Sequence, residues 1–226
     1  VSNMIETMRY RGPDDWGTWA EAAVGLGLGH ARLSILDVSP GGHQPMVSPS
    51  GRYLMVYNGE IYNFRSVRTR LEQAGETFLS DSDTEVVLHA FERDGVECLT
   101  EFNGIFAFGM HDRVEQKLYL VRDRLGIKPL YYLRQGEHLF FSSEIKPFEQ
   151  IPGITLTVDH AAVADYRGGQ DIVREGFYHE VVAVPPGSWG EVDLASGQLT
   201  TTPYVRLTDA IHPDRYRRMA IASEAS

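Results

Sequence analysis

The chain has 226 residues, of which 42% are hydrophobic and 23% charged, a composition typical of a globular protein with a large core. Its formal charge of -10 disfavours nucleic acid or an anionic membrane as a partner, because their phosphates would be repelled. Cys98 is the only cysteine, and neither a signal peptide nor a membrane-length apolar run is recognised, so we expect a cytoplasmic location.

The first residues are typical of the end of a helix. Ile5 and Met8 have helical spacing, and the helix is predicted to end at Arg11-Gly12-Pro13, because glycine closes a helix and proline prevents its restart. The sequence opens on Val1, without methionine, so we expect it to be a fragment. Between Ala22 and Ile35 apolar residues alternate with glycine, which predicts a strand that another backbone approaches closely.

A loop and a buried strand are predicted next. Residues 37–50 are rich in Gly, Pro and Ser, and long loops of this kind often carry sites. Residues 53–57 form an apolar run typical of a buried strand, and Asn58-Gly59 predicts that the strand breaks there. Such a break would place a backbone N–H beside a side-chain amide, as in an oxyanion hole. Taken alone, Asn-Gly indicates a plain hairpin turn instead.

Two helices are predicted to follow this strand. Asn63 is available as the N-cap of the first, whose apolar face ends before Gly75. Ser82 and Glu85 have the S-x-x-E spacing of a capping box, which predicts the start of a second helix that ends before Gly95.

The second half of the chain is predicted to be mainly strands. The apolar segments are 105–110, 118–121, 130–133 and 139–142, with 181–184 and 191–194 as a last hairpin. Residues 150–178 give no clear pattern, and 208–226 lack a sustained apolar period, which indicates a linker or tail. Strands, two adjacent helices and then more strands predict an α+β fold in which antiparallel sheets pack together with helices outside.

Several common kinds of site are excluded by their missing patterns. Cys98 has no histidine or other base beside it, so we expect it to be structural and not a nucleophile. The sequence contains no H-E-x-x-H or C-x-x-C pattern, so no metal site is expected. It also contains no P-loop pattern. The GLGLG run at 25–29 does not have the dinucleotide-binding spacing.

Nine short motifs then occur in a fixed order. They are RGPDD at 11–15, GHARLSILD at 29–37, GHQPM at 42–46, NGEIYN at 58–63, SDTE at 82–85, NGIFAF at 103–108, RDRLGIKPLYY at 122–132, FSSEIK at 141–146 and PPG at 185–187. Each is weak alone, but the series closely resembles the glutaminase domain of glutamine-dependent asparagine synthetases, a class II glutamine amidotransferase. The domain is expected to span residues 1–207, followed by the tail at 208–226.

This resemblance implies a fold and a chemistry. The fold is an αββα sandwich of the N-terminal-nucleophile hydrolase type. A cysteine at the mature N-terminus, with its own amine as base, attacks the glutamine side-chain amide to give a thioester and ammonia. The ammonia passes to a separate C-terminal synthetase domain that uses ATP and Mg²⁺ to amidate aspartate. No cofactor is implied in the glutaminase domain itself, and a homodimer is compatible with the resemblance.

The resemblance also implies roles for individual residues. Glu60 and Asp83 would hold the α-amino group of glutamine, and Arg32 its α-carboxylate, since an amino acid needs anions at one end and a forked cation at the other. The Asn58 amide and the Gly59 N–H would hold the oxyanion. The other implied residues are Leu33, Ser34, Ile35 and Leu36, whose backbone lines the pocket, and Arg11, which helps to position the nucleophile's end of the chain.

Three features depart from the family pattern. The nucleophilic cysteine with its strand and the Ser-Gly-Gly-x-Asp signature of the synthetase domain do not occur in these residues, and Tyr10 stands where histidine is usual. We therefore expect the chain to be inactive by itself. The alternative is a non-catalytic scaffold domain, as in related β-lactam or peptide-cyclising synthetases.

Overall fold

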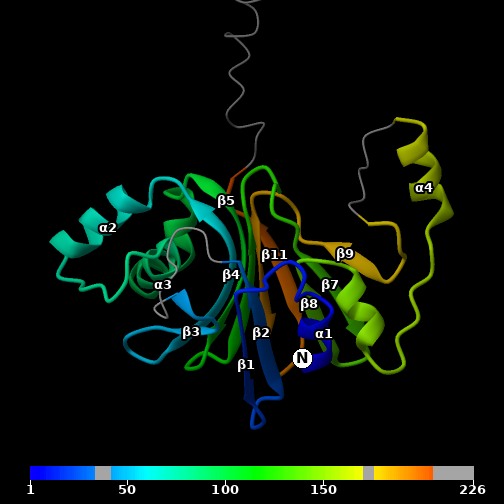
Figure 1. Cartoon of the computed structure of the whole chain (residues 1–226), viewed down its shortest axis with the longest axis horizontal. Helices are drawn as coiled ribbons and strands as arrows, with labels where there is room; N and C mark the ends of the chain where they lie inside the picture. The colour runs from blue at the N-terminus through cyan, green and yellow to red at the C-terminus, as the bar shows by residue number, and fades with distance from the viewer. Residues whose placement is uncertain (34–41, 170–175, 206–226) are drawn as a thin grey trace, which may run out of the picture.

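The computed structural model describes residues 1–33, 42–169 and 176–205, and Figure 1 draws the remainder as a thin grey trace. The predicted tail 208–226 and the predicted pocket residues Ser34, Ile35 and Leu36 lie outside the described residues. No helix in the described part of the chain is long and apolar enough to cross a membrane.

A six-stranded antiparallel sheet forms the centre of the molecule. Its strands, in spatial order, are β11 (Leu199–Pro203), β10 (Ser188–Asp193), β6 (Lys117–Arg122), β5 (Gly104–Asp112), β4 (Tyr53–Ile61) and β3 (Met46–Val47). Side chains alternate along β4, so Met55 and Tyr57 face one side of the sheet while Leu54 and Val56 face the other. Both faces are therefore apolar, and both are covered.

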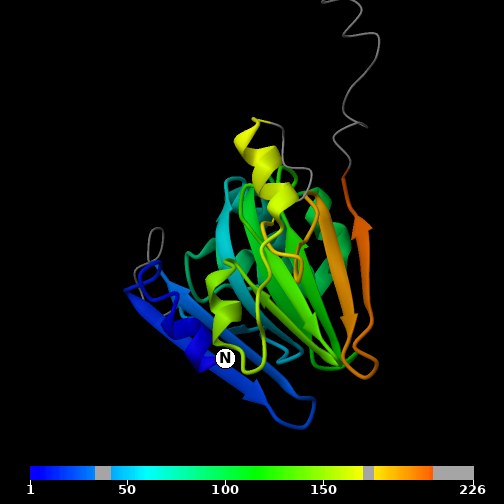
Figure 2. The same cartoon turned by 90° about the vertical axis from the view of Figure 1, so that its right-hand side faces the viewer.

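Helices cover one face and two small sheets cover the other. The helical side holds α2 (Phe64–Gln73), α3 (Asp83–Asp94) and the 3₁₀ helix η2 (Gly95–Thr100). The small sheets are β1 (Asp15–Glu21) with β2 (Leu26–Arg32), and β8 (His138–Ser142) with β7 (Tyr131–Gln135) and β9 (Val181–Ala183). In Figure 2 the β1–β2 hairpin stands along one side as a pair of blue strands.

The outer helices complete the sandwich. The short helices α1 (Ser2–Glu6) and η3 (Lys146–Gln150) pack on the small sheets, where Phe148 and Leu133 share a hydrophobic cluster against which Met4 packs. Helix α4 (His160–Arg167) comes between η3 and β9 in the chain. The predicted strand is present, but the atoms closest to Gly27 and Gly29 of β2 belong to the side chains of Val1 and Ile5 and not to another backbone. The predicted α+β fold, with helices outside antiparallel sheets, is confirmed.

The predicted break at Asn58-Gly59 is wrong. Strand β4 continues to Ile61, with Gly59 opposite Phe106 of β5. Pairing with a long neighbouring strand outweighs the local turn preference of Asn-Gly. A Cβ on Gly59 would lie 2.5 Å from the Phe106 Cα, so the glycine is needed for close packing of the two strands and not for a turn. Asn63 occupies the N-cap position of α2, as predicted.

The predicted last hairpin is also wrong. Strand β9 pairs with β7 in the three-stranded sheet, whereas β10 pairs with β6 and β11 in the central sheet. The segment Pro185-Pro186-Gly187 carries the chain from one sheet to the other, and Gly187 supplies a φ of 62°. The prolines and glycine end a strand as predicted, but the next strand joins a different sheet.

Candidate functional site

A cavity of about 1040 Å³ lies between the small sheets and strand β4. Its walls include residues of α1, β2, β4, the start of α3 and the end of β8. The predicted site residues that line it are Arg11, Arg32, Leu33, Asn58, Gly59, Glu60 and Asp83. The fold thus brings together residues that are more than seventy positions apart in the sequence.

The Gly59 N–H points to the outer edge of β4. Phe106 lies opposite Gly59, but both of its backbone groups bond Asp123 instead. The Phe106 N–H donates to Asp123 Oδ2 at 3.2 Å, and the Phe106 carbonyl accepts from the Asp123 N–H at 2.8 Å. Gly59 and Phe106 are therefore a non-hydrogen-bonded pair of the antiparallel ladder. The N–H groups of Tyr57 and Ile61, two residues away on either side, point to the same edge.

The Asn58 side chain reaches across the cavity. Its Nδ2 donates to Ser143 Oγ at 3.4 Å, and Ser143 follows β8 on the opposite wall. Asn58 and Gly59 are both half-buried and both line the cavity. A side-chain amide and a backbone N–H of adjacent residues therefore belong to this wall, although no turn is present.

Asp83 ties the start of α3 to β4. Its Oδ2 accepts hydrogen bonds from the Tyr57 hydroxyl and from the Ile61 N–H, each at 2.9 Å. Asp83 is buried, and this burial raises the pKa of its carboxyl above the ordinary value. The residue therefore has a structural role beside its predicted contact with substrate, which sequence reasoning did not identify.

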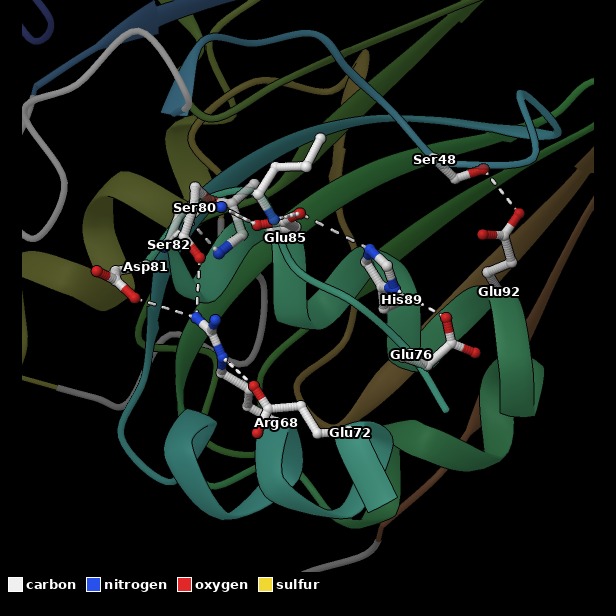
Figure 3. A network of polar contacts seen from close by, with 12 residues as sticks. Ser48, Arg68, Glu72, Glu76, Ser80, Asp81, Ser82, Glu85, His89 and Glu92 are labelled. Atoms are coloured by element: carbon white, nitrogen blue, oxygen red, sulfur yellow. Dashed lines mark hydrogen bonds and ion pairs between the residues drawn. The ribbon is translucent and has the colours of Figure 1, made fainter. Parts of the chain in front are cut away.

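The loop before Asp83 is fixed by a buried glutamate (Figure 3). Ser82 caps α3 by accepting from the Thr84 N–H, as predicted, at 3.2 Å. Glu85 does not complete a capping box, because the Ser82 N–H donates to Ser80 Oγ. Glu85 instead accepts from the N–H groups of Leu79 and Ser80, each at 2.8 Å, and from Ser80 Oγ at 2.6 Å.

The two predicted arginines lie at different places in the cavity wall. Arg32 ends β2, and its guanidinium lies against the backbone of Gly42, where a Cβ would collide with it. Arg11 forms an ion pair with Glu144, which also accepts from the Tyr10 hydroxyl. Burial opposes ionisation of Glu144, but the hydrogen bonds from Tyr10 and Arg11 outweigh it and lower its pKa. Leu33 is 55% exposed.

His30 is a cavity residue that sequence reasoning missed, although it lies inside the GHARLSILD motif. It lines the cavity, and its Nδ1 is buried without a hydrogen-bond partner among the described residues. Burial lowers the pKa of His30 to about 4. The imidazole is therefore neutral at physiological pH.

The neutral His30 predicts acid sensitivity. Because its folded-state pKa of about 4 lies below its ordinary 6.5, the unfolded state binds the extra proton and stability falls as pH drops from about 6.5 to about 4. The loss from this group is as much as about 3 kcal/mol. Chemical denaturation across this pH range should show a flatter profile for His30→Gln. Parallel profiles for the two proteins would contradict the assignment.

Cys98 lies away from the cavity, in η2. It is 3% exposed, and burial raises the pKa of its thiol, so the thiolate is disfavoured. The predicted packing role is confirmed. We expect Cys98→Ala to lower the free energy of unfolding by about 1–2 kcal/mol. Thermal denaturation checks this, and an unchanged free energy of unfolding would contradict the packing role.

Residues 1–205 match the family model described as "Glutamine amidotransferase domain". The chain belongs to this family. It is a class II glutamine amidotransferase domain, and its curated relatives include asparagine synthetase [glutamine-hydrolyzing] 3 of Bacillus subtilis strain 168. That relative is 39% identical over 170 residues, which are 74% of this chain and 27% of the relative.

Two further similarities add detail. "Amidase chry2" of Gibberella zeae is 38% identical over 148 residues, covering 66% of this chain and 22% of the relative. The amidotransferase domain thus spans roughly a quarter of these relatives' length. A solved structure of glutamine PRPP amidotransferase from B. subtilis has a TM-score of 0.57 at 20% identity, covering 79% of this chain and 35% of that one. It supports the fold alone.

Proposed function

We propose that the cavity binds L-glutamine and that the domain releases ammonia from it for asparagine synthesis. The observation that carries the proposal is the arrangement of charge and donors along the wall. The anionic Glu60 and Asp83 lie in β4 and at the start of α3, and the cationic Arg32 ends β2. The two neutral donors belong to Asn58 and Gly59 of β4. This set matches an ammonium, a carboxylate and an amide oxygen.

The proposed chemistry needs a thiol nucleophile. The sulfur of a thiolate bonds to the side-chain carbonyl carbon of glutamine, and the carbonyl oxygen gains a negative charge. The Asn58 Nδ2 and the Gly59 N–H would stabilise that charge. The nucleophile's own α-amine, acting as base, takes the thiol proton and passes it to the amide nitrogen, so that ammonia leaves as the carbon–nitrogen bond breaks. Water then hydrolyses the thioester, which releases glutamate and regenerates the thiol. Because Cys98 is buried outside the cavity, the thiol must come from beyond these 226 residues.

The larger protein is part of the same proposal. We infer an asparagine synthetase in which a separate C-terminal domain receives the ammonia and amidates aspartate. ATP and Mg²⁺ belong to that domain, and no residue of the present chain is assigned to them. A homodimer is compatible with this arrangement. The asparagine synthetase relatives support the inference.

A non-catalytic scaffold domain is the second candidate. One observation favours it: Tyr10 donates to Glu144 where the family usually has histidine. A scaffold has no need of a glutamine clamp, so the two candidates differ in ligand binding.

Titration with L-glutamine separates these candidates. NMR of the ¹⁵N-labelled chain should show saturable shifts at Gly59, Glu60 and Asp83, with D-glutamine and L-alanine as controls for the α-carbon configuration and the side-chain amide. Saturable, stereoselective binding supports the glutaminase. Absence of any shift in a folded protein would favour the scaffold.

A further inference from the structure

The segment Gly42–Pro45, from the GHQPM motif, crosses one end of the cavity and contacts three strands. Gly42 lies against the Arg32 guanidinium at the end of β2. His43 Nδ1 is 2.7 Å from Asp15 Oδ2 at the start of β1, and the Gln44 carbonyl covers Gly17 of the same strand. The segment therefore joins the two-stranded sheet to the central one beside the predicted carboxylate ligand.

Gln44 makes the contact with the central sheet. Its side chain is 5% exposed, and its Oε1 accepts from the Tyr57 N–H at 2.6 Å. Strand β3 pairs with β4 only at Leu54 and Met55, so the edge of β4 beyond them has no strand partner among the described residues. The Gln44 side chain therefore takes the place of a neighbouring strand as the hydrogen-bond acceptor for the Tyr57 N–H.

The outer edge of β4 is thus fixed on both sides of Gly59. Gln44 holds the Tyr57 N–H before it, and Asp83 holds the Ile61 N–H after it. Asp83 also accepts a hydrogen bond from the Tyr57 hydroxyl. Between these two bonded amides, the Gly59 N–H points to the same edge, and Gly59 lines the cavity.

We propose that Gln44 is a positioning residue of the glutamine site, which orients the Gly59 N–H toward the ligand by fixing the Tyr57 amide. This inference rests on the proposed function, since it concerns the same donor. Without the Gln44 carbonyl, the Tyr57 N–H is buried and unpaired, and the peptides between Tyr57 and Gly59 can rotate to find another acceptor. The contact between Gly42 of the same segment and the Arg32 guanidinium would shift together with these peptides.

Two variants and one control test this on the intact chain. Gln44→Met removes the acceptor at similar volume, and Gln44→Glu retains one. Gln73→Met makes the same change at an exposed position of α2. For each protein, amide hydrogen exchange by NMR, L-glutamine affinity and the unfolding midpoint are measured.

In the wild type, the Gly59 amide should exchange faster than those of Tyr57 and Ile61. In Gln44→Met, exchange at Tyr57 should rise at least about tenfold and the glutamine affinity should fall about tenfold, while most other amides keep their protection. Gln44→Glu should restore protection at Tyr57, and Gln73→Met should match the wild type in every measurement.

Unchanged exchange at Tyr57 and Gly59 in Gln44→Met would overturn the proposal whether or not glutamine binds. Faster exchange at Tyr57 with full glutamine affinity would also overturn it, because Gln44 would then be structural only. Absence of glutamine binding by the wild type is a separate result. It would refute the proposed function, and the exchange measurements on Gln44→Met would still show whether Gln44 fixes the Tyr57 amide.

Discussion

Arg32→Ala and Asp83→Asn are each expected to weaken the affinity for L-glutamine by roughly 10- to 150-fold. Each substitution removes a charge-assisted hydrogen bond to one end of the ligand, which contributes about 1.5–3 kcal/mol. The two residues come from β2 and α3, so their effects should be close to additive if each contacts a different end of glutamine. Isothermal titration with L-glutamine measures both variants and the double variant.

The structural role of Asp83 requires controls. Asparagine retains an oxygen that can accept from the Tyr57 hydroxyl or the Ile61 N–H, so the fold should survive, and the unfolding midpoint checks this. Asp81→Asn is the matched control in the same loop, because its side chain is 99% exposed. Arg65→Ala serves the same purpose for Arg32. Glutamine affinities unchanged in both Arg32→Ala and Asp83→Asn would remove the clamp from the proposal.

The sequence predicted best what depends on neighbouring residues. The apolar spacing predicts helices α2 and α3, and Ser82 and Gly95 mark the ends of α3, because caps act over one helical turn. Asn63 precedes α2, but its side chain bonds Glu101 and Asn103 instead of capping the helix. Strand β11 has mostly exposed side chains, so it has no apolar alternation to detect. Strand β9 joined a different sheet from β10, which local patterns do not encode.

The candidate site shows the same limit. The motifs predict that Arg32, Asn58, Gly59 and Asp83 share one site, and all four line the cavity. The motifs gave no role to Gln44, because its bond to Tyr57 joins a loop to a strand edge thirteen residues later. The geometry of Gly59 could not be predicted either, because it depends on the bonds that Phe106 makes with Asp123 on the far side of β5.

A polypeptide of these 226 residues is expected not to hydrolyse glutamine. An oxyanion hole stabilises charge only after a nucleophile has attacked, so Asn58 and Gly59 cannot replace a thiolate. Cys98 cannot supply one, because it is buried in η2 and its thiol pKa is raised. We therefore expect no hydrolysis at all, in contrast to the partial loss of glutamine affinity expected from Arg32→Ala and Asp83→Asn.

Glutamate release from L-glutamine by two chains tests this account most directly. One chain has these 226 residues, and the other is extended at its N-terminus to begin with cysteine. The account predicts background release from the first and enzymatic turnover from the second, which Cys98→Ala retains and Asn58→Ala reduces. Turnover by the 226-residue chain at about 1 per second or more would contradict the account, because a nucleophile within these residues would then have to exist.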